Sequence, residues 1–131
     1  LAGCISSHQS AAHSTSAVMW NADAPAVIRF DNTDTASIRE TSLVLRHDSR
    51  IKTDSVLLRI SSLSPDSCRR TDTLTVTLRR KPLSGDICQS MQAVPEYTRL
   101  RCMGLYTFEI APLAPVRGIW GAALDFSKTT K

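Results

Sequence analysis

Two stretches near the end of the 131-residue chain alternate between apolar and other residues, and they constrain the fold most strongly. They span residues 104–110 and 118–126, and the segment between them carries Pro112 and Pro115, which predict a loop. A period of two with aromatic and branched side chains on one face is typical of half-buried β-strands. We therefore expect both stretches at the centre of an antiparallel sheet. The side chains expected to point inward are Tyr106, Phe108, Ile110, Trp120, Ala122, Leu124 and Phe126.

The rest of the chain carries further strand patterns separated by turn residues, and no stretch keeps helical spacing over more than two turns. The expected strands are 26–30, 36–47, 54–63, 73–79, a short one near Ile87 and an edge strand at 97–102. About eight strands of this kind predict an all-β protein. We expect an antiparallel β-sandwich of the jelly-roll type, with a closed barrel as the alternative.

Size and charge narrow the classes of function. A length of 131 residues fits a single folded domain, which we place at residues 18–131. The net charge is +4, but the basic residues are spread along the chain instead of forming a stripe with interleaved aromatic residues, so nucleic acid is not an expected partner. No run of about 18 apolar residues is present, so no membrane-spanning segment is expected.

The N-terminus resembles a processing site. Leu1-Ala2-Gly3-Cys4 has the form of a bacterial lipobox, which predicts lipidation of Cys4 and attachment to a membrane through the lipid. The Ser- and Ala-rich residues that follow predict a flexible tether, so residues 1–17 form the lipobox remnant and tether. Position 5 is Ile5 and no acidic run follows, which favours the periplasmic face of the outer membrane.

The remaining polar residues suggest no catalytic or metal site. No nucleophile elbow, phosphate loop or metal-ligand spacing is present, so we expect a protein that is not an enzyme and that binds no metal or other cofactor. Three cysteines remain beyond Cys4. Either Cys88 and Cys102, which border expected strands, form a disulfide, or Cys68, Cys88 and Cys102 all stay reduced.

The order of short motifs resembles the gliding-motility lipoprotein family GldH. The resemblance covers residues 20–131 and rests on Trp20, residues 43–48 (LVLRHD), 71–74 (TDTL), 104–110 (GLYTFEI) and 117–119 (RGI), together with the lipobox. It departs at 51–55 and 82–91, which lack family features. The resemblance implies a non-catalytic outer-membrane lipoprotein that works with gliding-motility or type IX secretion machinery. Its partners would be envelope or secretion-machinery proteins.

A carbohydrate-binding module is the alternative function, because β-sandwiches commonly present a sheet face to glycans. Such a site needs exposed aromatic rings as platforms. The candidates are Trp20 and Tyr97, since the alternation predicts that Trp120 points into the core.

Overall fold

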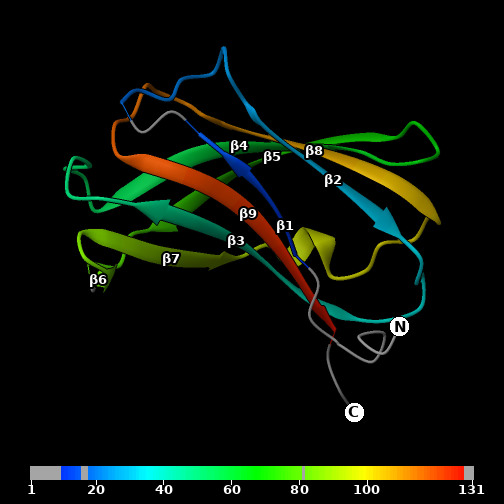
Figure 1. Cartoon of the computed structure of the whole chain (residues 1–131). Coiled ribbons are helices and arrows are strands. Elements are labelled where there is room, and N and C mark those ends of the chain that lie inside the picture. Colours follow the sequence, from blue (N-terminus) through cyan, green and yellow to red (C-terminus); the bar gives the residue numbers. More distant parts are fainter. Residues whose placement is uncertain (1–9, 16–17, 81, 129–131) are drawn as a thin grey trace.

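The chain folds as an all-β sandwich of two antiparallel sheets, which confirms the predicted fold class (Figure 1). The computed structural model describes residues 10–15, 18–80 and 82–128. One sheet has five strands in the order β1-β9-β3-β7-β6, and the other has four in the order β2-β8-β4-β5. The strands are β1 Ser10–Ser14, β2 Ala26–Asn32, β3 Arg39–His47, β4 Ser55–Leu63, β5 Arg69–Thr77, β6 Pro82–Ser84, β7 Ile87–Ala93, β8 Gly104–Pro112 and β9 Ile119–Lys128.

The strand order is that of a jelly roll. Strands β2, β3 and β4 fall alternately in the four-stranded, the five-stranded and again the four-stranded sheet. The two C-terminal strands, which we expected in one sheet, lie in different sheets. Strand β8 lies between β2 and β4, while β9 lies between β1 and β3. Each is therefore central, but in a different sheet, and the proline-containing connection carries the chain across the core.

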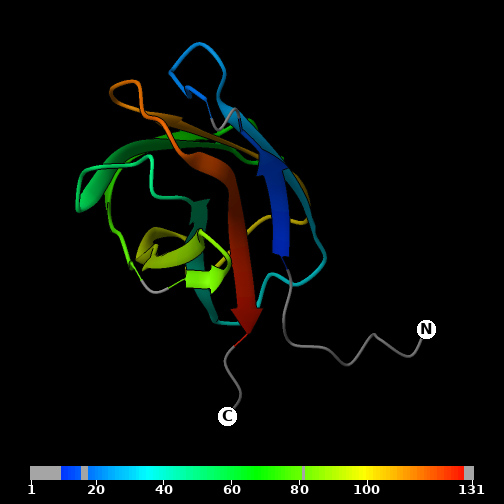
Figure 2. The same cartoon turned by 60° about the vertical axis from the view of Figure 1, so that its left-hand side comes forward.

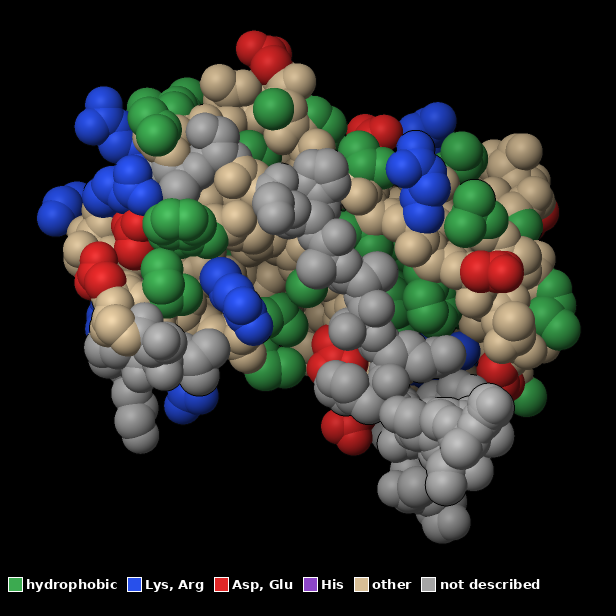
Figure 3. All heavy atoms as spheres, viewed as in Figure 1, with side chains coloured by type: hydrophobic (Ala, Val, Ile, Leu, Met, Phe, Trp, Pro, Cys, Tyr) green, Lys and Arg blue, Asp and Glu red, His purple; other side chains and the backbone are tan. Residues whose placement is uncertain are grey.

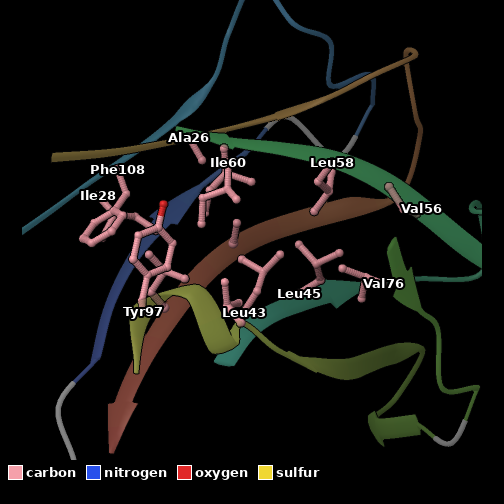
Figure 4. Packing of buried hydrophobic residues seen from close by; sticks show 14 of the residues in the cluster. Ala26, Ile28, Leu43, Leu45, Val56, Leu58, Ile60, Val76, Tyr97 and Phe108 are labelled. Carbon is pink, nitrogen blue, oxygen red and sulfur yellow. The ribbon is translucent and has the colours of Figure 1, made fainter. Parts of the chain in front are cut away.

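The core lies between the two sheets and is rich in aromatic contacts. Phe30 and Phe126 stack with ring centroids 4.3 Å apart, and Phe108 lies 5.6 Å from Phe126. Because β8 and β9 face each other, the alternating side chains of both strands meet here, and aliphatic residues from β3 and β4 fill the remaining space (Figure 4). Full burial of each large side chain contributes roughly 1.5–3 kcal/mol.

The first strand lies within the segment predicted as a flexible tether, and that prediction is wrong for residues 10–14. Strand β1 runs antiparallel beside β9, from Ser10 opposite Asp125 to Ser14 opposite Gly121 (Figure 2). The physical reason is that ladder hydrogen bonds join backbone groups, so a Ser- and Ala-rich segment without hydrophobic alternation can still occupy a sheet edge. The lipidation site predicted at Cys4 lies outside the described residues.

The edge strand predicted at 97–102 is also absent. Pro95–Tyr97 form a short 3₁₀ helix instead, with proline at its start, and a loop leads from it to β8. Proline suits the first turn of a helix because it has no N–H to leave unsatisfied. Among the described residues, no helix has the length and apolar character needed to cross a membrane.

Candidate functional site

Trp120 is the exposed aromatic residue of the molecule, and its predicted inward orientation is wrong. Its side chain is 47% exposed, whereas Ile119 is fully buried. The cause is a shift of register between β3 and β9, where Arg46 lies opposite Gly121 but His47 lies opposite Ile119. Trp120 is the extra residue of this β-bulge, so the alternation changes phase at its position. A bulge of this kind leaves no simple periodic signal in the sequence.

Asp48 holds the Trp120 ring in place. The indole Nε1 donates a hydrogen bond of 2.7 Å to Asp48 Oδ2, and the Arg50 Nη2 donates a second bond of 2.7 Å to the same oxygen. The Arg50 backbone N–H also donates to Asp48 Oδ1, at 2.9 Å. The Asp48 side chain is only 6% exposed. Hydrogen bonds from the Arg50 side chain lower the pKa of Asp48 to about 2, although burial opposes the shift.

Arg50 also packs on the ring. Its guanidinium carbon lies 5.8 Å from the centroid of Trp120, within the range of a cation–π interaction. The ring is therefore restrained both at its N–H and by a cation, while nearly half of its surface stays open to solvent. Hydrophobic, basic and acidic side chains adjoin one another on the left of the space-filling view, at the end where the β3–β4 loop lies (Figure 3).

Gly118 allows the β3–β4 loop to approach β9 closely. Its φ of +89° lies in the left-handed region, and its carbonyl accepts a 2.8 Å hydrogen bond from the Asp48 N–H. A Cβ at this position would lie 2.7 Å from Asp48 Oδ1 and 2.9 Å from the backbone nitrogen of Ile51. Glycine is therefore required for both conformation and space. Next to this contact, the Ser49 hydroxyl donates to Asp86 at 2.8 Å.

The two residues predicted as ligand platforms are buried, so that prediction is wrong. Trp20 is 1% exposed, and its indole N–H donates to the Ala24 carbonyl at 2.8 Å. Tyr97 is 4% exposed and its ring meets Phe108 edge-on, with centroids 5.2 Å apart. Both rings complete the core where loops close over it. Outside a strand, a hydrophobic pattern in the sequence does not show whether such a ring is buried or exposed.

The β4–β5 turn and the loop before β8 lie at the end of the sandwich opposite to the β3–β4 loop (Figure 1). A pocket lies beside them. Its volume is about 290 Å³, and its lining includes four arginines and two carboxylates. The Arg70 side chain pairs with Asp72 at 2.8 Å, but among the described residues no side-chain hydrogen bond or ion pair involves the other three arginines. This arginine pocket is lined by Arg69, Arg70, Arg99, Arg101, Asp66, Glu96, Tyr97 and Tyr106, with neighbouring residues. Guanidinium groups match carboxylate, sulfate and phosphate oxygens, so the pocket favours an anionic group.

A buried amide supports the loop that forms one wall of the arginine pocket. The Asn32 side-chain nitrogen donates to the carbonyls of Leu100 and Cys102, at 3.1 and 2.9 Å. The Asn32 oxygen in turn accepts a 2.9 Å bond from buried Arg39. Sequence analysis did not single out these polar residues, because nothing near them in the chain marks them as buried.

Of the two alternatives for the cysteines, the Cys88–Cys102 disulfide is absent, and Cys68, Cys88 and Cys102 are all free thiols. Cys88 is buried on β7 of the five-stranded sheet, whereas Cys102 lies in the loop before β8 and lines the arginine pocket together with Cys68. Bordering a strand in the sequence does not place two residues in the same sheet.

Packing accounts for His47. His47 is fully buried, and its Nε2 lies 2.8 Å from the Ser90 hydroxyl. Burial lowers the pKa of His47 and so favours its neutral form. The described part of the chain holds no group of three or more acidic, histidine or cysteine side chains that could bind a metal.

Comparison with known proteins shows likeness in fold. No family model and no curated protein matches the chain. Among solved structures, an Eiger TNF from S. frugiperda is similar with a TM-score of 0.54 and 10% identity, covering 95% of this chain and 94% of that one. A carbohydrate-binding module from glycoside hydrolase family 9 (Cel9A) of Ruminococcus flavefaciens FD-1 aligns with a TM-score of 0.47 and 9% identity, over 92% and 99%. CBM28, a carbohydrate-binding module specific for non-crystalline cellulose, aligns with a TM-score of 0.47 and 10% identity, over 81% of this chain and 67% of that one.

Proposed function

We propose that this protein is a non-catalytic glycan-binding module and that Trp120 is its platform. The observation that carries the proposal is a half-exposed indole ring that is already held in place. Its N–H is bonded to Asp48 and one part of its surface is in contact with Arg50. A ring that is ordered before binding loses little conformational entropy when a ligand arrives.

The chemistry around the ring suits a neutral sugar. A pyranose presents a face of C–H groups, which packs on an aromatic ring, and a rim of hydroxyl groups, which need hydrogen-bond partners. Arg50 supplies N–H donors beside the ring. Ser49 of the β3–β4 loop supplies a hydroxyl group, and Asp86 of the β6–β7 turn, to which it is hydrogen-bonded, supplies carboxylate oxygens. Arg50, the cation that lies over the ring, is paired with Asp48, so its charge is balanced at the platform.

A glycan array followed by titration tests this function. We expect at least one neutral oligosaccharide to bind and to change tryptophan fluorescence, and Trp120→Ala to weaken that binding by tenfold or more, since one stacking contact contributes on the order of 1.4 kcal/mol. Leu105→Ala is the matched control, because Leu105 is 51% exposed but lies on β8. The proposal fails if no glycan binds, or if Trp120→Ala and Leu105→Ala bind equally well.

A second proposal concerns where the module works. The Leu1–Cys4 lipobox and the resemblance to GldH support a lipid-anchored component of gliding-motility or type IX secretion machinery. In the native cells, an alkyne-tagged fatty acid should label the protein, and Cys4→Ala should remove the label and release the protein from the membrane fraction. An unlabelled wild-type protein would refute the anchor. Unchanged motility and secretion after deletion of the gene would refute the role.

A further inference from the structure

Two of the chain's thiols meet beside the arginine pocket. Cys68 ends the turn between β4 and β5, and Cys102 lies 34 residues further along the chain, in the loop before β8. Both line the pocket, and the Cys68 side chain is exposed while Cys102 is partly buried. The glycan binding proposed at Trp120 needs neither these two thiols nor the arginine pocket.

The two thiols share one pocket wall with Asp66. The Cys68 sulfur lies 3.5 Å from Asp66 Oδ2, and Cys102 lines the same pocket as both residues. Two thiols that line one pocket are neighbours in space. A disulfide needs Cβ atoms about 3.5–4.5 Å apart, a separation that the backbone sets, and rotation about the Cα–Cβ bonds then brings the two sulfurs together.

The backbone holds the two loops against each other. The Ser64 N–H donates to the Cys68 carbonyl at 2.9 Å, which closes the turn, and the Cys102 N–H donates to the Tyr106 hydroxyl at 3.0 Å. Gly104 packs so closely on the turn that an added Cβ would lie 3.3 Å from the Pro65 ring. The two cysteine backbones are therefore positioned independently of any bond between the sulfurs.

We propose that Cys68 and Cys102 form an intramolecular disulfide by exchange with a small-molecule disulfide such as oxidised glutathione. The Cys68 thiolate attacks one glutathione sulfur, which forms a mixed disulfide and releases one glutathione thiolate. The Cys102 thiolate then attacks the Cys68 sulfur and displaces the second glutathione. Two cysteine thiols are oxidised, one glutathione disulfide is reduced to two thiols, and the two cysteine protons pass to the leaving thiolates.

Asp66 controls how fast the first step proceeds. Its hydrogen bond and its negative charge raise the pKa of the Cys68 thiol, so less of the attacking thiolate is present at neutral pH. Asp66 itself stays ionised, because the Ser64 hydroxyl and the Cys68 N–H donate to it and lower its pKa. The charged groups that face Cys68 from the neighbouring loops and strands are the other pocket residues: Arg69, Arg70, Arg99, Arg101 and Glu96. We expect Asp66→Asn to speed the exchange, because it removes the charge and keeps an acceptor oxygen.

The test uses the full chain with Cys4→Ser as the background, so that the N-terminal thiol does not interfere. Titration with oxidised glutathione should consume two of the three remaining thiols, and non-reducing peptide mass spectrometry should recover the Cys68–Cys102 link. The oxidised protein should melt about 10 °C above the reduced protein, because the bond closes a long loop of the unfolded chain. With Cys88→Ala added, both remaining thiols should be consumed, and the link and the rise in melting temperature should be the same.

Single variants separate the proposal from its alternatives. With Cys102→Ser, Cys68 should stop at the mixed disulfide with glutathione. With Cys68→Ser, neither a link nor a rise in melting temperature should appear. A wild-type product in which Cys68 stays glutathionylated beside a free Cys102, or in which Cys88 is the bonded partner, overturns the proposal. If Asp66→Asn does not speed the exchange, the role assigned to Asp66 is wrong even where the link is recovered.

Discussion

The two ends of the sandwich use arginine in opposite ways. At one end, Arg50 forms an ion pair with Asp48, and the pair supports the exposed ring of Trp120. At the other end, Arg70 alone has a carboxylate partner while three further arginines around the pocket have none among the described residues, and the aromatic rings beneath are buried. At the first end the cation beside the exposed ring is paired with a carboxylate, whereas at the second end most of the arginines around the pocket have no such partner in the described part of the chain.

The difference shows how one scaffold separates two kinds of recognition. At the Trp120 end, Arg50 is already paired, so the shape and the apolar surface of the ring select the ligand. We expect binding of this kind to depend little on salt concentration. Unpaired guanidinium groups attract anions over a distance, and salt at physiological strength screens this attraction beyond about 8 Å. Strands β3, β4, β8 and β9 run between the two ends. The residues in the loops and at the strand ends therefore determine which ligand each end can bind.

The strongest test of the Trp120 end is Gly118→Ala. The added Cβ would meet Asp48 Oδ1 at 2.7 Å and the Ile51 backbone, at a φ of +89°. We expect a loss of about 2–4 kcal/mol in the free energy of unfolding, measured by urea denaturation. Gly85→Ala is the control, because Gly85 also has a positive φ of +56° but no atom within 4 Å of the new Cβ. Equal losses in the two variants would show that the close contact at Gly118 contributes nothing.

A smaller effect is expected from Asp48→Asn. The change keeps the shape of the side chain but removes the charge that Arg50 and the Trp120 N–H share. We expect a loss of about 1–3 kcal/mol at pH 7, because position 48 is buried and a neutral amide is a weaker acceptor for both donors. The variant should also weaken glycan binding, since the ring loses part of its support.

The pH dependence of Asp48 follows from the sign of its shift. Its pKa is lowered to about 2 in the folded protein from an ordinary value of 3.8. The ionised form is therefore favoured by folding, so its contribution is complete above about pH 5 and is lost as the pH falls through 4 toward 2. Acid titration of the unfolding free energy should show this loss in the wild type, and Asp48→Asn should remove that part of the curve.

The smallest effect is expected at the arginine pocket, where Asp72→Asn breaks the exposed Arg70 pair. The side chains are 53% and 27% exposed, so solvent screens the attraction and we expect a change of at most about 0.5 kcal/mol. A loss as large as that of Asp48→Asn, in the same urea experiment, would contradict the contrast between the two ends.

Sequence reasoning worked where one local pattern settles the outcome. The alternation in residues 104–110 predicts β8 and its buried face, because Tyr106, Phe108 and Ile110 recur with the period of a strand. The Ser- and Ala-rich β1 shows the limit of this approach. An edge strand can form through backbone hydrogen bonds alone, so its side chains carry no signal of the pairing.

The amino-acid sequence by itself determined the all-β class, most strand positions and the apolar faces that the two sheets bury. Only the tertiary structure decided that β8 and β9 lie in different sheets, that a bulge turns Trp120 to solvent, and that Cys102 lies beside Cys68 and not Cys88. The physical reason is the distance along the chain over which the residues that determine each feature are spread. Strand patterns arise from residues two apart, whereas sheet partners, register shifts and loop contacts depend on residues tens of positions away in the chain.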